Sequence, residues 1–366
     1  MKGANRAGDL ATPIPVVHLD RLEANLAGWA EAIAGHGVGL RPHAKTHKTV
    51  EVARRQLEHG AIGLTVAKPS EGLGLLDSGV TDLLVAYPIV GPARTAELLA
   101  LARKVRTMSC IDGLGAARAL SDAAREAGLV HDVLIDVDTG LRRTGLPPDD
   151  AVELAVAADA LPGIAVVGVF SYAGYPGKRQ DPADRRAWAH QEARLTVQVA
   201  EALRERGLAI GTVSVAGTPT ARFAAEVDGV TEVRPGIYAF GDANTSWLGA
   251  MELDACALRI LATVVSRPRA DRAVLDAGTK ALAADPGLDG HTYGHLPAHP
   301  GARLARVWEE HGVLELSPEP GGGADLQVGD RVEIVPNHVC PAVNLAPRLA
   351  ALEGDRVVGS WEVAAR

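Results

Sequence analysis

The sequence contains only three cysteines in 366 residues, Cys110, Cys256 and Cys340. So few cysteines do not form the disulfide framework of a small secreted domain. They fit a reducing compartment, where a special cysteine acts as a metal ligand or a nucleophile.

Long apolar runs are also missing. The start, MKGANRAGDLATPIPVV, lacks the continuous apolar core of a signal peptide. No stretch reaches the roughly 20 apolar residues that a membrane-spanning helix needs. We therefore expect a cytoplasmic protein with no membrane partner.

An excess of positive charge is absent as well. The chain has 37 Lys and Arg against 45 Asp and Glu, a formal net charge of −8. A negative protein repels polyanions, so we expect no nucleic-acid partner, although a local basic patch can still occur. Apolar residues make up 47% of the chain, enough for a core, and the length predicts one large domain with an appendage or two domains.

Short apolar runs recur along the first two thirds of the chain. The segments between them carry Ala, Leu, Glu and Arg at helical spacing and often end in Gly. These runs predict eight strands, at residues 38–45, 61–67, 82–88, 105–111, 132–138, 164–171, 212–217 and 232–239.

The alternation of strands and helices predicts a parallel sheet, and eight units match an α/β fold of the (β/α)8 TIM-type barrel class. An open, doubly wound sheet is the alternative. No GxGxxG motif follows the first strand, which disfavours a dinucleotide-binding fold.

After about residue 246 the pattern changes to β-rich segments with longer loops, such as ALRILATVVSR and DRVEIVPNHVC. We predict a barrel over residues 20–246. Residues 1–19 and 247–366 are predicted to form a second, β-rich domain, although the strand at 13–19 could join either part.

The segment RPHAKTHK, Arg41 to Lys48, crowds cationic and titratable side chains into an otherwise acidic protein. In a strand, side chains alternate between faces, so Arg41, His43, Lys45 and His47 would point the same way. A barrel builds its site at the carboxyl ends of its strands, so Lys45 is predicted at the barrel mouth. Neighbouring positive charge and desolvation lower the pKa of such a lysine and free its amine. A solvated basic loop is the alternative.

Two later loops are rich in groups that bind anions. They are AGTPT, Ala216 to Thr220, and RPGIY, Arg234 to Tyr238. Barrels often bind phosphate after their last two strands, where glycines let backbone amides approach an anion. Together with Lys45, these loops suggest a phosphorylated ring cofactor that is bonded covalently at its other end. Pyridoxal phosphate fits that description.

The segment PNHVC places His338 and Cys340 two residues apart after a predicted strand. In an extended segment both side chains point the same way. An imidazole and a thiolate together suit zinc or a similar divalent ion such as Mn or Mg, and two protein ligands leave positions open for substrate. A buried cysteine beside a surface histidine is the alternative.

Taken together, RPHAKTHK, DVDTGLRRTG, AGTPT, RPGIYAFGD and PNHVC resemble the fold-type III pyridoxal phosphate enzymes. The similarity is to the D-threonine aldolase and D-serine dehydratase family, distant relatives of alanine racemase. It extends over nearly the whole chain, with the motifs in the family's order.

This resemblance implies a role for each candidate residue. Lys45 would bind the cofactor covalently, and Lys48 would begin the next helix without a catalytic role. His338 and Cys340 would hold the metal, which engages the β-hydroxyl of the substrate. The remaining cofactor-binding candidates are Tyr172, Arg143 at the phenolic oxygen, Arg234 near the pyridine nitrogen, and Gly217, Thr218, Gly236 and Ile237 around the phosphate.

The family catalyses two reactions on small β-hydroxy-D-amino acids. An aldolase breaks the Cα–Cβ bond and gives glycine and an aldehyde, whereas a dehydratase eliminates β-hydroxide and gives a 2-oxo acid and ammonia. Tyr172 in SYAG and the segment DAGTKALAADPG resemble the aldolases, while the pair of His338 and Cys340 resembles the dehydratases. We expect an aldolase, with the dehydratase as the alternative. His291 and His295 are candidates for the base that acts on the hydroxyl, and ordinary loop residues otherwise.

Two other functions share the barrel and the lysine. A non-catalytic pyridoxal phosphate carrier consists of the barrel alone, and an amino-acid racemase needs a second base and no metal. The second domain and the candidate metal pair argue against the carrier, and the metal pair also argues against the racemase. Relatives are typically dimeric, so the resemblance also implies a homodimer.

Overall fold

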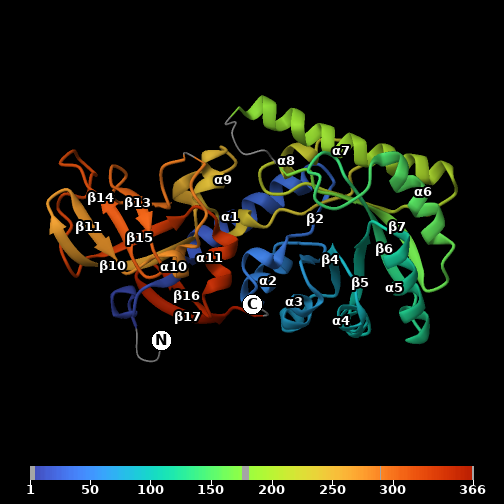
Figure 1. Cartoon of the computed structure of the whole chain (residues 1–366), viewed down its shortest axis with the longest axis horizontal. Coiled ribbons are helices and arrows are strands. Elements are labelled where there is room, and N and C mark those ends of the chain that lie inside the picture. Colours follow the sequence, from blue (N-terminus) through green and yellow to red (C-terminus); the bar gives the residue numbers. More distant parts are fainter. Residues whose placement is uncertain (1–4, 175–180, 289, 365–366) are drawn as a thin grey trace.

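The computed structural model describes residues 5–174, 181–288 and 290–364. The chain folds into two lobes, one built on a parallel sheet with helices around it and the other on a largely antiparallel sheet (Figure 1). Among the described residues, no helix combines the length and the apolarity that crossing a membrane requires.

The first lobe contains eight parallel strands in the order β2-β9-β8-β7-β6-β5-β4-β3. An isolated parallel bridge between His43 and Thr65 connects the extension of β2 to β3, so the two ends of the sheet meet. The strands are β2 (Gly39–Leu40), β3 (Leu64–Val66), β4 (Asp82–Pro88), β5 (Arg106–Ile111), β6 (His131–Val137), β7 (Ile164–Ser171), β8 (Thr212–Val215) and β9 (Glu232–Val233).

Helices follow most of these strands and cover the outside of the sheet (Figure 1). The barrel-lobe helices are α1 (Leu19–Ala34), α2 (Val50–Glu58), α3 (Pro69–Gly74), α4 (Pro92–Ala102), α5 (Leu114–Glu126), α6 (Pro148–Asp159), α7 (Pro182–Glu205), α8 (Ala221–Ala224) and α9 (Ala243–Trp247). The predicted fold class is confirmed, and each of the eight predicted strands overlaps an observed one.

Burial explains why the strands could be located. Strands such as β4, β5 and β6 are buried on both faces, as parallel strands between helices and a filled barrel must be. Their sequences therefore read as short continuous apolar runs. The shortest strands of this sheet, β2 and β9, are two residues long.

The second lobe contains a sheet of nine strands that runs β13-β14-β11-β10-β1-β16-β17, with β15 pairing β10 and β12. Its strands are β1 (Ile14–His18), β10 (Leu258–Arg269), β11 (Arg272–Leu275), β12 (Gly294–His295), β13 (Arg303–Val307), β14 (Gly312–Glu315), β15 (Arg331–Pro336), β16 (Arg348–Glu353) and β17 (Arg356–Glu362).

The strand near the amino terminus belongs to this second sheet. β1 pairs antiparallel with β10 and parallel with β16, and makes no ladder with the barrel strands. The strand at residues 13–19, which the sequence did not assign to either part, therefore pairs within the second sheet. The domain boundary between residues 246 and 247 stays a prediction.

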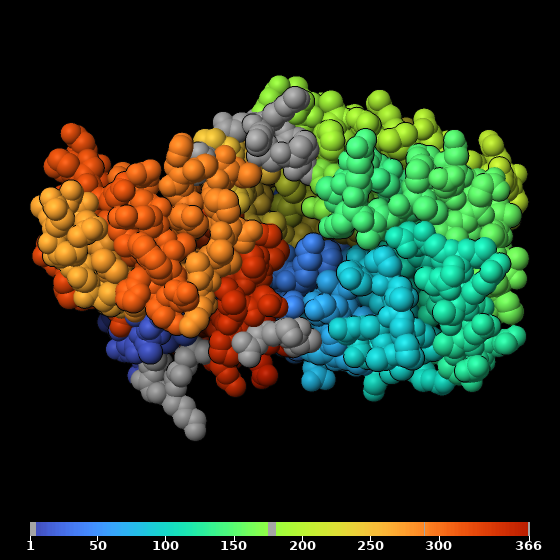
Figure 2. Space-filling model, in the orientation of Figure 1, coloured from blue at the N-terminus to red at the C-terminus, as the bar shows by residue number. Residues whose placement is uncertain are grey.

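Two short helices of the second lobe, α10 (Thr279–Leu282) and α11 (Val339–Leu345), pack against each other. α11 also contacts the 3-10 helix η2 (Ala44–Thr46), which contains Lys45. The carboxy-terminal residues, red in Figure 2, accordingly lie against the blue amino-terminal part of the barrel. The two lobes therefore meet at the residues that the sequence singled out.

The structure corrects the prediction that residues 38–47 form one strand with alternating faces. β2 ends at Leu40, and Ala44–Thr46 form η2, in which His43 Nδ1 accepts a hydrogen bond from the Lys45 amide at 3.4 Å. Lys45 therefore reaches the barrel mouth from a helical turn. The side chains of Arg41, His43, Lys45 and His47 do not share one face.

Arg41 lies within the barrel and does not flank Lys45. Its guanidinium donates to Glu232 at 2.8 Å and to Asp82 at 2.6 Å, and these carboxylates stand at the first residues of β9 and β4. The arginine and Glu232 are both buried. This pairing connects the carboxyl end of β2 to the amino ends of β9 and β4, so Arg41 is structural.

We predict that Arg41→Met destabilises the protein by about 3–5 kcal/mol, because it leaves the buried Glu232 carboxylate without its partner. Urea denaturation measures this loss. The matched control is Arg206→Met, whose partner Glu153 and own side chain are exposed, and which should change stability by less than about 1 kcal/mol. Equal effects of the two substitutions would contradict the assignment.

Candidate active site

Lys45 lies at the carboxyl end of β2, in the turn that η2 forms. Its Nζ lies 5.9 Å from the centroid of the Tyr172 ring, which follows β7. The guanidinium carbon of Arg143, from the loop after β6, lies 5.2 Å from the same centroid. The barrel thus brings together three of the predicted residues from three different strands.

Burial lowers the pKa of Lys45 below its ordinary value, and the positive charges of Arg143 and Arg234 act in the same direction. The charges of Cys340 and Glu71 oppose this shift and do not reverse it. A larger fraction of uncharged amine is therefore present near neutral pH than on a surface lysine. The uncharged amine is the nucleophilic and basic form.

The two histidines beside Lys45 differ in their surroundings. Burial, followed by the charges of Lys45 and Arg234, lowers the pKa of His43 well below its ordinary value. His47 is fully buried, and its ring lies 3.2 Å from the Gln56 side chain. Burial lowers its pKa to about 4. His43 is therefore a neutral neighbour of the lysine, whereas His47 is a structural residue.

Lys48 is held in an ion pair away from Tyr172. Its Nζ lies 3.2 Å from Glu71 and donates to Asn344 at 2.7 Å. The predicted start of the next helix at Lys48 is two residues early, because α2 begins at Val50 with Thr49 as its N-cap.

The two predicted phosphate loops lie side by side and are joined through Thr218. Its Oγ1 accepts hydrogen bonds from the amides of Gly236 and Tyr238, each at 3.2 Å. Ile237, between them, begins the 3-10 helix η4 (Ile237–Ala239). Several backbone amides and a hydroxyl thus converge in one place.

Both glycines of these loops stand where a side chain would not fit. A Cβ on Gly217 would lie 2.9 Å from the Tyr172 ring, and one on Gly236 would lie 2.7 Å from Thr46 Oγ1. Glycine is therefore needed so that the loops can approach the lysine turn and the tyrosine.

Arg234 is buried beneath this site and has no carboxylate partner among the described residues. It donates to the Ser214 hydroxyl at 2.6 Å and to the Ser171 carbonyl, and it stacks on the Phe170 ring. Burial lowers its pKa. Such a guanidinium has spare donor capacity toward a ligand in the barrel.

These features fit a phosphorylated pyridine aldehyde. The site combines a lysine with a lowered pKa with a cluster of backbone amides and a threonine hydroxyl. The aromatic ring of Tyr172 lies beside the lysine, and the guanidinium of Arg234 is buried. The individual cofactor contacts remain predictions.

The candidate metal pair lies at the start of α11. His338 is the N-cap residue and Cys340 is in the first turn, so the segment is not extended as predicted. The two side chains nevertheless lie close to each other, because Cys340 is foremost among the groups that raise the pKa of His338. A helix start replaces a strand because the chain turns sharply after β15 to pack against η2.

Burial acts to lower the pKa of His338, but the hydrogen bond and charge of Cys340 and the charges of Asp242 and Asp285 outweigh it. The pKa is raised to about 9 as a result. Asp285 Oδ1 lies 3.5 Å from His338 Nδ1. A carboxylate beside the ring of a ligating histidine is a common way to orient it.

Two contacts connect this pair to the barrel. Thr46 Oγ1 lies 3.3 Å from Cys340 Sγ, and Thr46 follows Lys45 directly. Asp242, at the end of the barrel lobe, accepts a hydrogen bond from the Val339 amide at 3.1 Å. The lysine and the histidine–cysteine pair therefore belong to one site.

The donors of this pair fit a divalent ion with a preference for nitrogen and sulfur. Within residues 5–174, 181–288 and 290–364, no group of three or more His, Cys, Asp or Glu side chains is arranged to hold a metal. A metal bound by two side chains keeps positions open, which suits a catalytic role rather than a structural one.

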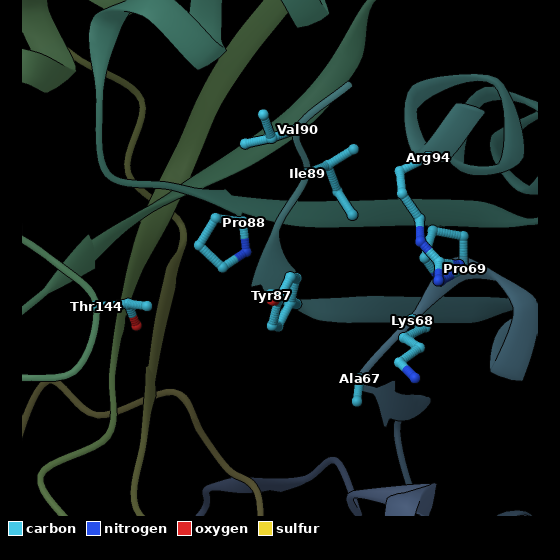
Figure 3. Close-up of a pocket in the computed structure, with 9 residues that line it drawn as sticks. All are labelled: Ala67, Lys68, Pro69, Tyr87, Pro88, Ile89, Val90, Arg94 and Thr144. Carbon is cyan, nitrogen blue, oxygen red and sulfur yellow. The ribbon is translucent and has the colours of Figure 1, made fainter. Parts of the chain in front are cut away.

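A groove of about 390 Å³ opens beside this site, at the carboxyl ends of β3 and β4 (Figure 3). Its walls are largely apolar, with Tyr87 and Val90 at the surface. Lys68 and Arg94 supply positive charge, and none of its lining residues is acidic.

His291 and His295 lie near β12 in the second lobe. His295 Nε2 lies 3.3 Å from the Thr292 hydroxyl, and the residue lines a separate cavity of about 480 Å³ with Glu252 and Asp254. His291 lies in the loop before β12, whereas His295 is the last residue of β12 and pairs with Val335 of β15. Their predicted role as a base stays untested.

Sequence reasoning missed two residues that position the metal pair. Asn337 donates to the backbone carbonyls of Asp285 and Thr292, and Asp242 caps α9 through the Thr245 amide besides holding Val339. The helix-capping pattern of Asp242 and Thr245 was visible in the sequence. The contact of Asp242 with the Val339 amide in the second lobe was not visible in the sequence.

The comparison with protein families decides the relationship. A family described as "Alanine racemase, N-terminal domain" matches residues 17–244, more than half of the chain.

The chain belongs to this family. The resemblance drawn from the motifs is thereby confirmed. A second family, described as "Putative serine dehydratase domain", matches residues 257–352. This member of the alanine racemase N-terminal domain family thus combines the barrel with a second conserved unit.

Curated relatives match over nearly the whole chain. A D-threonine aldolase from Arthrobacter sp. is 37% identical and covers 97% of this chain and 92% of its own. A D-threo-3-hydroxyaspartate dehydratase from Delftia sp. (strain HT23) is 36% identical, with coverages of 96% and 97%. The crystal structure of D-threonine aldolase from Filomicrobium marinum superposes with a TM-score of 0.92 at 34% identity, covering 99% of this chain and 97% of that one.

We predict that His338→Ala and Cys340→Ala each weaken Zn²⁺ binding by about 100-fold or more, and that Asp285→Asn weakens it about tenfold. Competition with a chromogenic chelator measures these affinities. His36→Ala, at the exposed end of α1, is the control and should bind Zn²⁺ as the unmodified protein does. Unchanged affinity in both the His338 and Cys340 variants would exclude this pair as the metal site.

Proposed function

We propose that the chain is a lyase that acts on β-hydroxy-D-amino acids with pyridoxal phosphate and a divalent metal. One observation carries this proposal. The 3.3 Å contact between Thr46 and Cys340 places a lysine with a lowered pKa next to an imidazole–thiol pair. An aldolase and a dehydratase among its close relatives support the same class of substrate.

Lys45 would bind the cofactor, and the other candidates would hold it. The cofactor supplies an electron sink next to the α-carbon of the substrate. The residues that we assign to it are Lys45, Arg143, Tyr172, Gly217, Thr218, Arg234, Gly236 and Ile237.

The protein's part of the chemistry begins with the amine of Lys45. Since burial and two arginines lower its pKa, it is free to attack a carbonyl carbon and afterwards to accept or return a proton. Tyr172 packs against Gly217 and faces both Lys45 and Arg143, so it limits where a ring can lie. Exclusion of water by these groups strengthens their electrostatic effect.

His338 and Cys340 would hold the metal on the side of Lys45 that faces the second lobe. A divalent ion there acts as a Lewis acid toward the β-oxygen of a substrate. The position of the pair is fixed from both lobes, through Asp242 and through Asn337.

We favour the aldolase reaction, in which the β-hydroxyl loses its proton, the Cα–Cβ bond breaks, and glycine and an aldehyde form. Tyr172 after β7 supports this choice through its resemblance to the aldolases. The second candidate is the dehydratase. There the α-proton is removed and β-hydroxide leaves, and hydrolysis yields a 2-oxo acid and ammonia. The Cys340 thiol in the metal pair favours it.

A carrier without catalysis would have no use for the metal pair, and a racemase would retain activity after chelation. The homodimer, the cytoplasmic location and the absence of a nucleic-acid partner stay predictions.

The experiment that tests the function combines purified protein with pyridoxal phosphate, a divalent metal and one of four substrates. These are D-threonine, D-phenylserine, D-serine and D-threo-3-hydroxyaspartate. We expect glycine and an aldehyde, and their loss on chelation. A 2-oxo acid with ammonia would assign the dehydratase instead, and activity that survives chelation would contradict the metal-dependent class.

We also predict that Lys45→Ala abolishes the visible absorption of bound cofactor and lowers kcat/KM by about 10²–10⁴-fold, because it removes the amine that reacts. Lys48→Ala removes the ion pair with Glu71 and should keep the absorption. Absorption spectra of both variants check this prediction. The reverse pattern would contradict the assignment of Lys45.

A further inference from the structure

Glu192 is a buried carboxylate that none of the steps above uses. It lies in α7, on the side that packs against the barrel strands, and its exposed fraction is 1%. A carboxylate in such a position is costly unless it accepts hydrogen bonds. Its partners therefore indicate what it does.

One oxygen of this carboxylate joins two neighbouring strand ends. Glu192 Oε1 accepts a hydrogen bond from the Ser171 hydroxyl at 3.1 Å and from the Ala216 amide at 3.0 Å. Ser171 is the last residue of β7, and Ala216 directly follows β8. Ser171 is held further by the Thr196 hydroxyl, from the next turn of α7, at 2.8 Å.

The two residues that Glu192 holds each precede a candidate cofactor residue. Tyr172 follows Ser171, and Gly217 follows Ala216. These two are in close contact, since a Cβ on Gly217 would lie 2.9 Å from the tyrosine ring. A shift at the end of β7 or of β8 would therefore displace both Tyr172 and Gly217.

Ala216 has a left-handed backbone conformation, with φ of +64°. Residues other than glycine adopt this region only when the surrounding structure holds them in it. The hydrogen bond from the Ala216 amide to Glu192 does this. It also sets the direction in which the chain enters Gly217 and Thr218.

We propose that Glu192 is the positioning residue of the candidate phosphate loop. Its carboxylate reaches from α7 to the ends of β7 and β8, and thereby keeps Ala216, Gly217 and Tyr172 in the arrangement that the cofactor needs. The part of this inference that concerns the cofactor rests on the proposed function. The ordering of the loop by Glu192 does not.

The reach of the side chain is the property that distinguishes this role. Glutamine has the same length and keeps an oxygen that can accept the two hydrogen bonds. Aspartate keeps the charge but is one methylene shorter, so its oxygens cannot reach both donors. A positioning role predicts that Glu192→Gln binds the cofactor and protects the Ala216 amide from exchange as the unmodified protein does. Glu192→Asp should be impaired in both properties.

The test uses cofactor-free full-length protein and two measurements. Titration with pyridoxal phosphate should show a Kd about tenfold higher for Glu192→Asp and Glu192→Ala, and within about threefold of the original for Glu192→Gln. Hydrogen exchange of the Ala216 amide, without cofactor, should be faster in the first two variants only. Glu201→Ala, on the exposed side of the same helix, is the control and should change neither value.

The inference is overturned if Glu192→Asp binds and exchanges as the unmodified protein does, or if Glu192→Gln is impaired as strongly as Glu192→Asp. If Glu192→Ala does not fold, the comparison of Asp with Gln still decides. If the unmodified protein does not bind pyridoxal phosphate, the proposed function fails. The exchange of Ala216 then still tests whether Glu192 orders the loop.

Discussion

The contact between Thr46 and Cys340 is the constraint on which the rest of the site depends. Thr46 directly follows Lys45 in the sequence, and Cys340 lies two residues after His338. A barrel alone would present the lysine at an open mouth. The second lobe brings the pair of His338 and Cys340 next to the turn that contains this lysine.

The fold holds this contact from both sides. On the barrel side, the His43 ring caps the turn of Lys45, and Gly236 approaches Thr46 closely enough to exclude a side chain. On the other side, the Asp242 carboxylate binds the first amide of α11. The reactive groups are therefore placed by backbone geometry and buried hydrogen bonds, which resist displacement better than long surface side chains do.

The sequence was a good guide to the barrel because buried parallel strands leave short apolar runs that helical spacing separates. It also indicated Lys45, Gly217 and Gly236 as candidates, because their motifs combine reactive groups with glycines at strand ends. Their roles toward the cofactor stay predictions. The prediction for Arg41 was wrong, because it assumed that side chains alternate between two faces, as in a strand, through residues that instead form η2. The ion pairs that hold Arg41 with Asp82 and Glu232 join residues far apart in the chain, so no local pattern revealed them.

The same limit applies to Glu192 and Asp242. Both are acidic residues on helices or at their ends, which by themselves predict a solvated face or a cap. Their importance comes from burial and from partners on other elements, Ala216 for Glu192 and Val339 for Asp242. Only the tertiary structure provides this information. The residue types of the histidine–cysteine pair suggested a metal site, and that role stays a prediction. Its backbone is the start of a helix rather than a strand.

The most direct test of the central claim is to locate the cofactor on the chain. The protein is incubated with pyridoxal phosphate and reduced with borohydride, and tandem mass spectrometry of the peptides identifies the modified lysine. The account predicts a single modification at Lys45. Modification at Lys48 or at another lysine, with Lys45 unmodified, would contradict it.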